Sequence, residues 1–435
     1  MYKLKERKIK CNSDYEVIVV GGGPAGCTAA ASAAREGSKT LLIEATSSLG
    51  GMGTNALVPA WTPFSDREKI VYKGMAEFVF NETKAGMPYL KQNAIDWVAI
   101  DSERLKRVYD DLVLNHGADL LFNSFVCDIE ENDGKIESII VANKLGLTAF
   151  KAKIFVDCTG DADLVSMSYS PVVKGDDFNS TLQPATHCFI LSNVNTQKLK
   201  EHGRLHADNP KSFIHKLLEE KKYPMLRDGH VIGTKVGPTT VGFNAGHIFN
   251  VDGTDPFSVS KGLVTGRKMA EEFRVAFKDY APSIFGNAHL AATGSLLGIR
   301  ETRRIVGEYI LTVDDYFERK TFSDEVCRNS YFIDVHGSKL AAEAKGKLEK
   351  YKKGESHGIP YRCMIPISLK NVLVAGRSIS CERLVQGSVR VMPSCLAMGE
   401  GAGLAASLAT KQDDVRNIDI NYLRKRLLEE GAYIL

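Results

Sequence analysis

VIVVGGGPAG, residues 17–26, is the stretch of sequence that decides the fold. Its first four residues are apolar and predict a strand buried in a parallel sheet. The alanine-rich residues that follow predict a helix, and Gly37 stands where helices commonly end on a glycine. A second apolar strand is expected at 40–43, and it ends in Glu44. Together these residues predict a complete unit of strand, helix and strand.

Each glycine of the bend has a physical task in binding a dinucleotide. Gly21 permits a tight turn, Gly23 lets a pyrophosphate approach the backbone, and Gly26 lets the helix pack close to the sheet. The helix N-terminus offers N–H groups and a positive dipole end to the phosphates. We therefore expect the cofactor to contact Gly21, Gly23, Pro24, Ala25 and Gly26. A chance glycine turn in an unrelated α/β protein is the alternative, since such turns are common.

Glu44 and the residues after it distinguish the two common dinucleotides. The Glu44 carboxylate, at the end of the second strand, can accept both hydroxyls of an adenosine ribose. It is followed by ATSSLGGMGT, residues 45–54. This stretch resembles the extended fingerprint of the FAD-binding glutathione-reductase-like superfamily, in which a Gly-Gly pair follows the ribose carboxylate. The resemblance implies FAD contacts at Glu44, Ala45, Gly50, Gly51 and Met52.

The middle of the chain continues the same pattern. We expect a helix over 96–115 and strands at 120–122, 126–130, 136–142 and 148–155, with a hairpin turn at Asn132-Asp133-Gly134. This β-meander leads into IFVDCTGDAD, residues 154–163, which resembles the second nucleotide-contact motif of the superfamily. The resemblance implies cofactor contacts at Val126, Thr159 and Gly160. An ordinary strand-to-loop turn is the alternative.

Two further segments near the C-terminus resemble superfamily motifs. Residues 371–377 predict an apolar strand that ends at Gly376. Arg377 stands where the superfamily has an acid, and an arginine fork suits phosphate oxygens. A helix rich in small residues follows, and the resemblance implies that its N-terminus, at Met392, faces the flavin pyrimidine. There the helix dipole would stabilise negative charge on reduced flavin. Plain helix packing also explains the small residues.

The change of pattern along the chain predicts two domains. Between about 170 and 290, strands such as 187–191 and 239–249 alternate with charged helical runs such as 211–222. We expect an α/β fold: a Rossmann-type FAD-binding domain with a β-meander, plus a smaller α+β substrate (cap) domain. The FAD-binding domain is predicted to be discontinuous, over 12–165 and 291–435, and the cap domain to span 166–290.

These motifs resemble, in order from about residue 15 to 410, the bacterial FAD-dependent oxidoreductases, a family related to the succinate dehydrogenase/fumarate reductase flavoproteins. Further quoted stretches are DGTDP from Asp252, GIRETRRIVGEYILT from Gly298 and IPYRCMIP from Ile359. The resemblance implies an oxidoreductase that transfers a hydride between a small organic substrate and FAD. Residues 50–60 hold no histidine that could link the flavin, so FAD is expected to be non-covalent. No second glycine fingerprint for a nicotinamide cofactor occurs, so the electron donor or acceptor is unknown.

The candidates for catalysis are basic residues in the family-like stretches: Arg300, His247, Arg362 and Arg390. If the substrate is a carboxylate, analogy with the relatives implies arginine clamps. Each candidate has a structural alternative. Glu301 and Arg304 read as a surface ion pair on a helical path, and a buried histidine such as His247 or His187 is commonly a hydrogen-bonded structural group. Cys395 reads as a small helix-packing residue.

Composition excludes several classes of protein. The chain has 435 residues, 56 basic and 53 acidic, with a net charge of +3, which favours neither a nucleic-acid nor a membrane partner. The nine cysteines include no CxxC pair, so we expect no metal site and reduced thiols in a cytoplasmic protein. The basic first residues lack the apolar run of a signal peptide. The sequence leaves open whether the protein is an oligomer.

A second function class remains open from the sequence. The chain could be a flavin-fold binding protein with structural or absent FAD and no redox activity. The intact glycines and Glu44 argue against this reading, because they are the residues that grip the cofactor.

Overall fold

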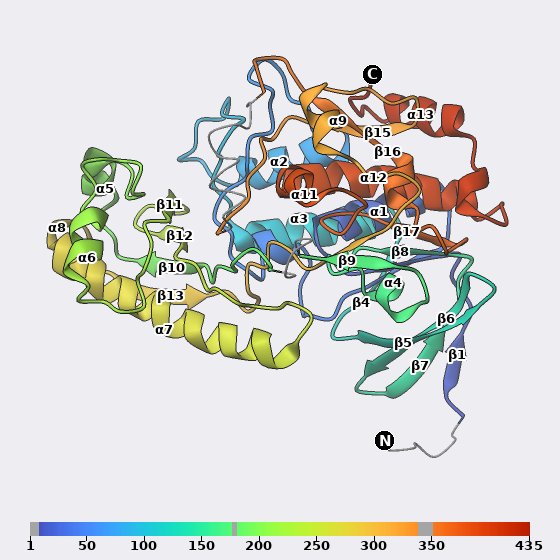
Figure 1. The fold of residues 1–435 in the computed structure, drawn as a ribbon, viewed down its shortest axis with the longest axis horizontal. Helices are drawn as coiled ribbons and strands as arrows, with labels where there is room; N and C mark the ends of the chain where they lie inside the picture. Colours follow the sequence, from blue (N-terminus) through green and yellow to red (C-terminus); the bar gives the residue numbers. More distant parts are fainter. Residues whose placement is uncertain (1–7, 176–180, 338–350) are drawn as a thin grey trace.

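A five-stranded parallel sheet forms the centre of the molecule, as the computed structural model shows (Figure 1). The structure describes residues 8–175, 181–337 and 351–435. The strand order is β17-β8-β2-β3-β4, and every neighbouring pair is parallel. The strands are β2 (Val17–Val20), β3 (Thr40–Ile43), β4 (Asp119–Leu121), β8 (Ile154–Asp157) and β17 (Val372–Val374). The carboxyl ends of β2 and β3 therefore lie side by side, as the expected unit of strand, helix and strand requires.

Helices α1 (Pro24–Arg35) and α12 (Met392–Ala409) pack against each other beside this sheet. A Cβ atom at Gly399 would lie 2.1 Å from the carbonyl oxygen of Ala25, and one at Gly403 would lie 2.1 Å from that of Ala29. The glycines of α12 are thus explained by backbone-to-backbone packing. Further helices of this region are α2 (Met75–Ala85), α3 (Ser102–Asn115) and α13 (Ile420–Glu429). The helix expected over 96–115 begins later, because Asp101 caps it.

A second sheet carries the β-meander, in the order β1-β7-β6-β5. Its strands are β1 (Lys10–Asn12), β5 (Phe125–Asn132), β6 (Lys135–Asn143) and β7 (Gly146–Phe150). The prediction of a single strand over 148–155 was wrong. It is divided at Lys151–Lys153, so that β7 joins this sheet while β8 joins the parallel one.

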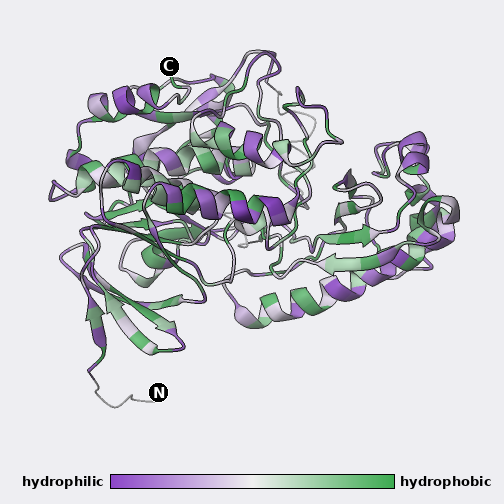
Figure 2. Cartoon of the chain, turned by 180° about the vertical axis from the view of Figure 1, so that it is seen from behind, coloured by the Kyte–Doolittle hydropathy of each residue, from purple (hydrophilic) through white to green (hydrophobic). Residues whose placement is uncertain are grey.

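A third sheet lies to one side of the molecule, in the order β11-β12-β10-β13, with the long helix α7 (Pro256–Tyr280) along it (Figure 1). The strands are β10 (Phe189–Ser192), β11 (Val231–Lys235), β12 (Val241–Ala245) and β13 (His289–Thr293). Figure 2 shows hydrophobic and hydrophilic segments alternating along α7, as expected for a helix with one buried face. Phe189 stacks on Phe243 and Phe273 in a separate apolar core. The division into 12–165, 291–435 and 166–290 stays a prediction, and β13 extends this sheet to Thr293.

Shorter elements complete the fold. They are α4 (Asp163–Met167), β9 (Val172–Lys174), α5 (Thr196–His202), α6 (Ile214–Glu220), α8 (Pro282–Phe285), β14 (Arg303–Ile305), α9 (Val313–Phe317), β15 (Glu325–Asn329), β16 (His357–Pro360) and α11 (Arg383–Val389). Among the described residues, no helix combines the length and apolar character needed to cross a lipid bilayer.

The stretch GIRETRR does not follow a helical path. Its last two residues, Arg303 and Arg304, begin β14, which pairs with β9. The ion pair of Glu301 with Arg304 (3.1 Å) is buried rather than on the surface. Glu301 also forms an ion pair with Arg383, from a distant part of the chain, at 2.8 Å. The surface-pair interpretation was therefore wrong, because spacing in the sequence does not reveal burial.

Candidate functional site

The glycine bend between β2 and α1 has the geometry that a pyrophosphate needs. Gly21 has φ +96°, and a Cβ atom at Gly26 would lie 1.8 Å from the carbonyl oxygen of Gly21. A side chain at Gly26 would thus push α1 away from the strand. Gly23 is the N-cap of α1, no side chain caps the helix there, and no atom lies within 4 Å of where its Cβ would be. The N-terminus of α1, with Pro24 and Ala25, is therefore open to an anion.

Glu44 is held in position at the end of β3. Its Oε2 accepts a hydrogen bond from the backbone N–H of Gly22 (2.6 Å), and its Oε1 accepts one from that of Thr46 (2.7 Å). Each carboxylate oxygen has a second lone pair for another donor. The half-buried Glu44 side chain can thus accept two ribose hydroxyls without breaking these bonds.

The loop with the Gly-Gly pair lies against the bend. Gly50 donates its N–H to the carbonyl of Gly22 (2.7 Å). A Cβ atom at Gly51 would lie 3.3 Å from the Cα of Gly23, and both Gly50 (φ +100°) and Gly51 (φ +50°) have left-handed backbone. Met52 lies in the short 3-10 helix η1 (Gly51–Gly53). The fold thus brings the two expected cofactor segments into direct contact.

The motif after β8 meets the one after β17. Arg377 forms an ion pair with Asp161 (2.8 Å), and a Cβ atom at Gly160 would lie 3.0 Å from the Arg377 guanidinium carbon. Gly376 has φ +102° and faces the Cβ of Ala25 at 3.4 Å. The buried Nε of Arg377 has no partner in the described parts of the chain. An incoming acceptor, such as a phosphate or ribityl oxygen, would satisfy this donor.

Helix α12 directs its N-terminus toward the same region. No side chain caps it, and the sulfur of Met392 is 3.2 Å from where a Cβ of Gly53 would lie. The buried hydroxyl of Ser394, in the first turn, lacks a partner. Val126, in β5, is buried in the apolar cluster beneath the meander, and its contact with the cofactor stays a prediction. The open glycine bend, the Glu44 carboxylate and these unsatisfied polar atoms are together suited to bind FAD.

Three of the four catalytic candidates come together. Arg300 is 7% exposed and donates to the carbonyl of Pro184 (2.7 Å). Burial and the charge of Arg390 lower the pKa of Arg300 to about 10. Arg390 donates to the carbonyl of Asp334 (2.9 Å), and its buried Nε has no partner within residues 8–175, 181–337 and 351–435. Because Arg390 directly precedes the α12 cap, this cluster borders the expected flavin site.

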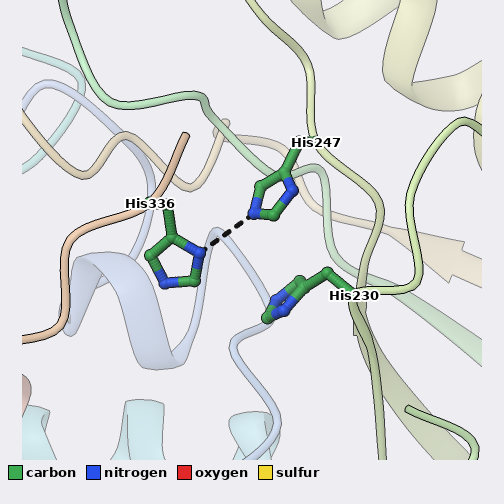
Figure 3. A group of neighbouring side chains, drawn as sticks. All are labelled: His230, His247 and His336. Atoms are coloured by element: carbon green, nitrogen blue, oxygen red, sulfur yellow. Dashed lines mark hydrogen bonds between the residues drawn. The ribbon is translucent and has the colours of Figure 1, made fainter. Parts of the chain in front are cut away.

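His247 belongs to a group of three histidines (Figure 3). Its Nε2 lies 3.0 Å from the Nδ1 of His336, and the His230 ring stacks on the His247 ring with centroids 4.7 Å apart. Burial, followed by the charge of Arg300, lowers the pKa of His230 to about 3. Burial lowers the pKa of His336 to about 4, although Asp334 opposes the shift.

Sequence reasoning missed His230, His336, Asp228 and Asp334, because they lie in different segments and match no spaced motif. We expected no metal-ligand set, yet the fold brings the three histidines together. All nine cysteines lie within the described residues and are unpaired there.

Arg362, the fourth candidate, lies apart from this cluster. It binds Asp324 through two hydrogen bonds (2.8 and 3.1 Å) and lies over the ring of Tyr309. About half of its side chain is exposed. His187 is buried and bonded to the carbonyl of Gly294 (2.7 Å), which matches the structural interpretation. Cys395 is a buried packing residue of α12, and burial raises its pKa to about 12.

A cavity of about 210 Å³ lies where the third sheet meets the loop after η1. It is lined by residues that include Gly53, Ile100, Ile190, Thr240 and Gly242. The turn between β11 and β12 borders it, whereas His230 and His247 lie at the other end of that hairpin. Both ends of the hairpin thus adjoin residues expected near the flavin.

Curated proteins match only parts of the chain. A nicotine dehydrogenase from Pseudomonas putida is 56% identical over 43 residues, which is 10% of this chain and 9% of that protein. A thiamine thiazole synthase from Methanococcus vannielii is 30% identical over 166 residues, 35% of this chain and 59% of that protein. The matched stretches thus span less than two thirds of these relatives.

Solved structures match over nearly the whole chain at low identity. A geranylgeranyl bacteriochlorophyll reductase-like protein from Thermoplasma acidophilum aligns over 98% of this chain and 85% of its own, with 13% identity and a TM-score of 0.47. The anhydrotetracycline hydroxylase OxyS from Streptomyces rimosus aligns over 96% and 66%, with 12% identity and a TM-score of 0.46.

A protein-family model identifies the family of the chain, which the partial matches leave open. The model described as FAD dependent oxidoreductase matches residues 16–427, a range that contains the bend, Glu44, the third sheet and α12. With the open bend and the held carboxylate, this match makes FAD the cofactor. The chain belongs to the family of FAD-dependent oxidoreductases.

Proposed function

We propose that the protein transfers a hydride between a small organic substrate and non-covalently bound FAD. Bound FAD would supply the redox chemistry, and the chain would bind and orient the substrate and exclude water. Non-covalent binding is supported by the loop at 50–60, which offers no histidine to the flavin. The cytoplasmic location, inferred from the unpaired cysteines, is part of this proposal, as is an electron partner outside this chain.

The observation that carries the proposal is the donor cluster beside the N-terminus of α12. Arg300, Arg390 and His247 come from three separate segments of the chain. Asp334 contacts Arg390 and His336, and His336 in turn contacts His247 at 3.0 Å. Burial, followed by repulsion from the Arg390 guanidinium, lowers the pKa of Arg300 to about 10. A substrate oxygen that accepts from both would relieve this repulsion. We therefore propose a substrate with carboxylate or carbonyl oxygens, held by Arg300 and Arg390.

The test is an anaerobic screen of sugars, polyols and carboxylates for bleaching of the flavin absorbance. We expect one class to bleach the flavin and Arg300→Gln to slow that reaction about a hundredfold, in the range of losing one donor to a reacting oxygen. Arg362→Gln is the matched control, with less than about a threefold effect expected since its partner is the distant Asp324. Both variants must retain FAD absorbance and bleaching by dithionite.

Two outcomes would overturn the proposal. If Arg300→Gln and Arg362→Gln slow the reaction equally, the cluster does not hold the substrate. If the bound flavin resists every reductant, dithionite included, the chain is a flavin-fold binding protein in which FAD is structural.

A further inference from the structure

The three histidines converge on one point from separate segments of the chain (Figure 3). His230 directly precedes β11, His247 follows β12, and His336 comes from the segment after β15. One ring nitrogen of each lies within 4.8 Å of the corresponding atoms of the other two. Two nitrogens that each bind a tetrahedral zinc ion at about 2.05 Å lie about 3.3 Å apart. The 3.0 Å between His247 Nε2 and His336 Nδ1 is near that spacing.

Two carboxylates orient these rings from behind. Asp228 Oδ2 lies 3.3 Å from the Nδ1 of His247, and Asp334 Oδ1 lies 3.3 Å from the Nε2 of His336. Each contact engages the ring nitrogen that points away from the cluster. The arrangement matches the carboxylate–histidine–metal pattern, in which the outer partner fixes the tautomer and aims the other nitrogen at the ion.

A purely hydrogen-bonded cluster does not account for His230. A proton between His247 and His336 satisfies only those two rings, whereas the buried Nε2 of His230 has no partner among the residues that the structure describes. A buried polar atom in that state calls for a ligand. A metal ion would accept a lone pair from all three rings at once.

The surrounding charges allow a cation. Arg300 and Arg390 are balanced by Asp228 and Asp334, two positive against two negative charges, and imidazole ligands are neutral when they bind a metal. No fourth histidine, cysteine or carboxylate completes the group among the described residues. One coordination position would thus stay open, as in catalytic rather than structural zinc sites.

We propose that His230, His247 and His336 bind a divalent first-row metal ion of the kind imidazole favours, such as Zn²⁺ or Fe²⁺. The remaining coordination position takes an oxygen of water or of the substrate. His247 then acts on the substrate through the ion. Metal binding at this site does not depend on the proposed substrate or on hydride transfer.

The experiment measures Zn²⁺ binding to the full-length, FAD-loaded protein after metal removal with EDTA. Isothermal titration with Zn²⁺ should give one equivalent per chain with a Kd of about 1 µM or tighter, which corresponds to about −8 kcal/mol of binding free energy. His230→Asn and His247→Asn should weaken binding at least about a hundredfold, and Asp228→Asn about ten- to a hundredfold. His289→Asn, on the exposed start of β13, is the control and should bind as the unaltered chain does.

Flavin absorbance and the thermal midpoint show that each variant is folded. The proposal is overturned if the unaltered protein takes up less than a tenth of an equivalent at 10 µM free Zn²⁺. It is also overturned if folded His230→Asn and His247→Asn bind as tightly as His289→Asn. Repeating the titration with Fe²⁺ under anaerobic conditions distinguishes the two ions. These outcomes leave the flavin reaction untouched, since the bleaching assay reports that separately.

Discussion

Gly23→Ala separates cofactor binding from folding more cleanly than any other single substitution of the bend. Gly23 has ordinary negative φ (−71°), and a methyl group there would meet no atom of the described residues within 4 Å apart from its neighbours along the chain. The substitution should thus change the free energy of unfolding of the flavin-free protein by no more than about 0.5 kcal/mol. The same methyl group would enter the space that we assign to the FAD pyrophosphate.

The cost to FAD binding follows from that overlap. Forcing an extra methyl group into a packed contact costs about 1–3 kcal/mol. Since about 1.4 kcal/mol is tenfold in affinity, the Kd for FAD should rise about 5- to 150-fold. The assay is titration of the flavin-free protein with FAD, followed by quenching of flavin fluorescence, beside a urea unfolding curve of the same protein without FAD.

Gly26→Ala is the matched comparison. Its methyl group would lie 1.8 Å from the carbonyl oxygen of Gly21, so this variant should lose both stability and FAD affinity. If Gly23→Ala folds and binds FAD with an unchanged Kd, the pyrophosphate does not lie at this bend and the reasoning is refuted.

Two further predictions concern buried charges. Glu301→Gln should lower the free energy of unfolding by about 3–5 kcal/mol, because Arg304 loses a buried ionic partner. Glu103→Gln, which loses an exposed pair with Lys106, should cost less than about 0.5 kcal/mol, and equal effects in urea unfolding would contradict this. Burial, followed by the charges of neighbouring aspartates, raises the pKa of Asp163 to about 7. Ionised Asp163 therefore lowers the free energy of unfolding. This destabilisation is absent below about pH 4 and grows as the pH rises to about 7. Asp163→Asn should thus raise the thermal midpoint of flavin-free protein more at pH 8 than at pH 5, and an equal rise at both would count against it.

The geometry of the glycine bend was largely predictable because its determinants are local. The buried strand, the bare bend and Glu44 lie within thirty residues, and each has a conformational requirement that the sequence displays. Gly21 and Gly376 have the left-handed backbone that only glycine adopts freely. The contact of Gly51 with Gly23 follows from the same short segment.

The chemistry beyond the cofactor was less predictable because it depends on long-range packing. His247 and His336 are 89 positions apart, and nothing in either segment points to the other. Arg362 and Arg300 look alike in the sequence, but only the fold ties one to Asp324 and buries the other. Helix α7 did have a local signal that went unused: Asp255 caps it and Pro256 begins it.

The most direct test of the account is the flavin content of the full-length protein. After loading with FAD and removal of the excess, the protein is denatured with acid, and the released flavin is identified by chromatography. We predict about one FAD per chain in the supernatant and a colourless precipitate. Flavin retained in the precipitate would contradict non-covalent binding, and protein that holds no FAD after loading would contradict the assignment of the bend and of Glu44.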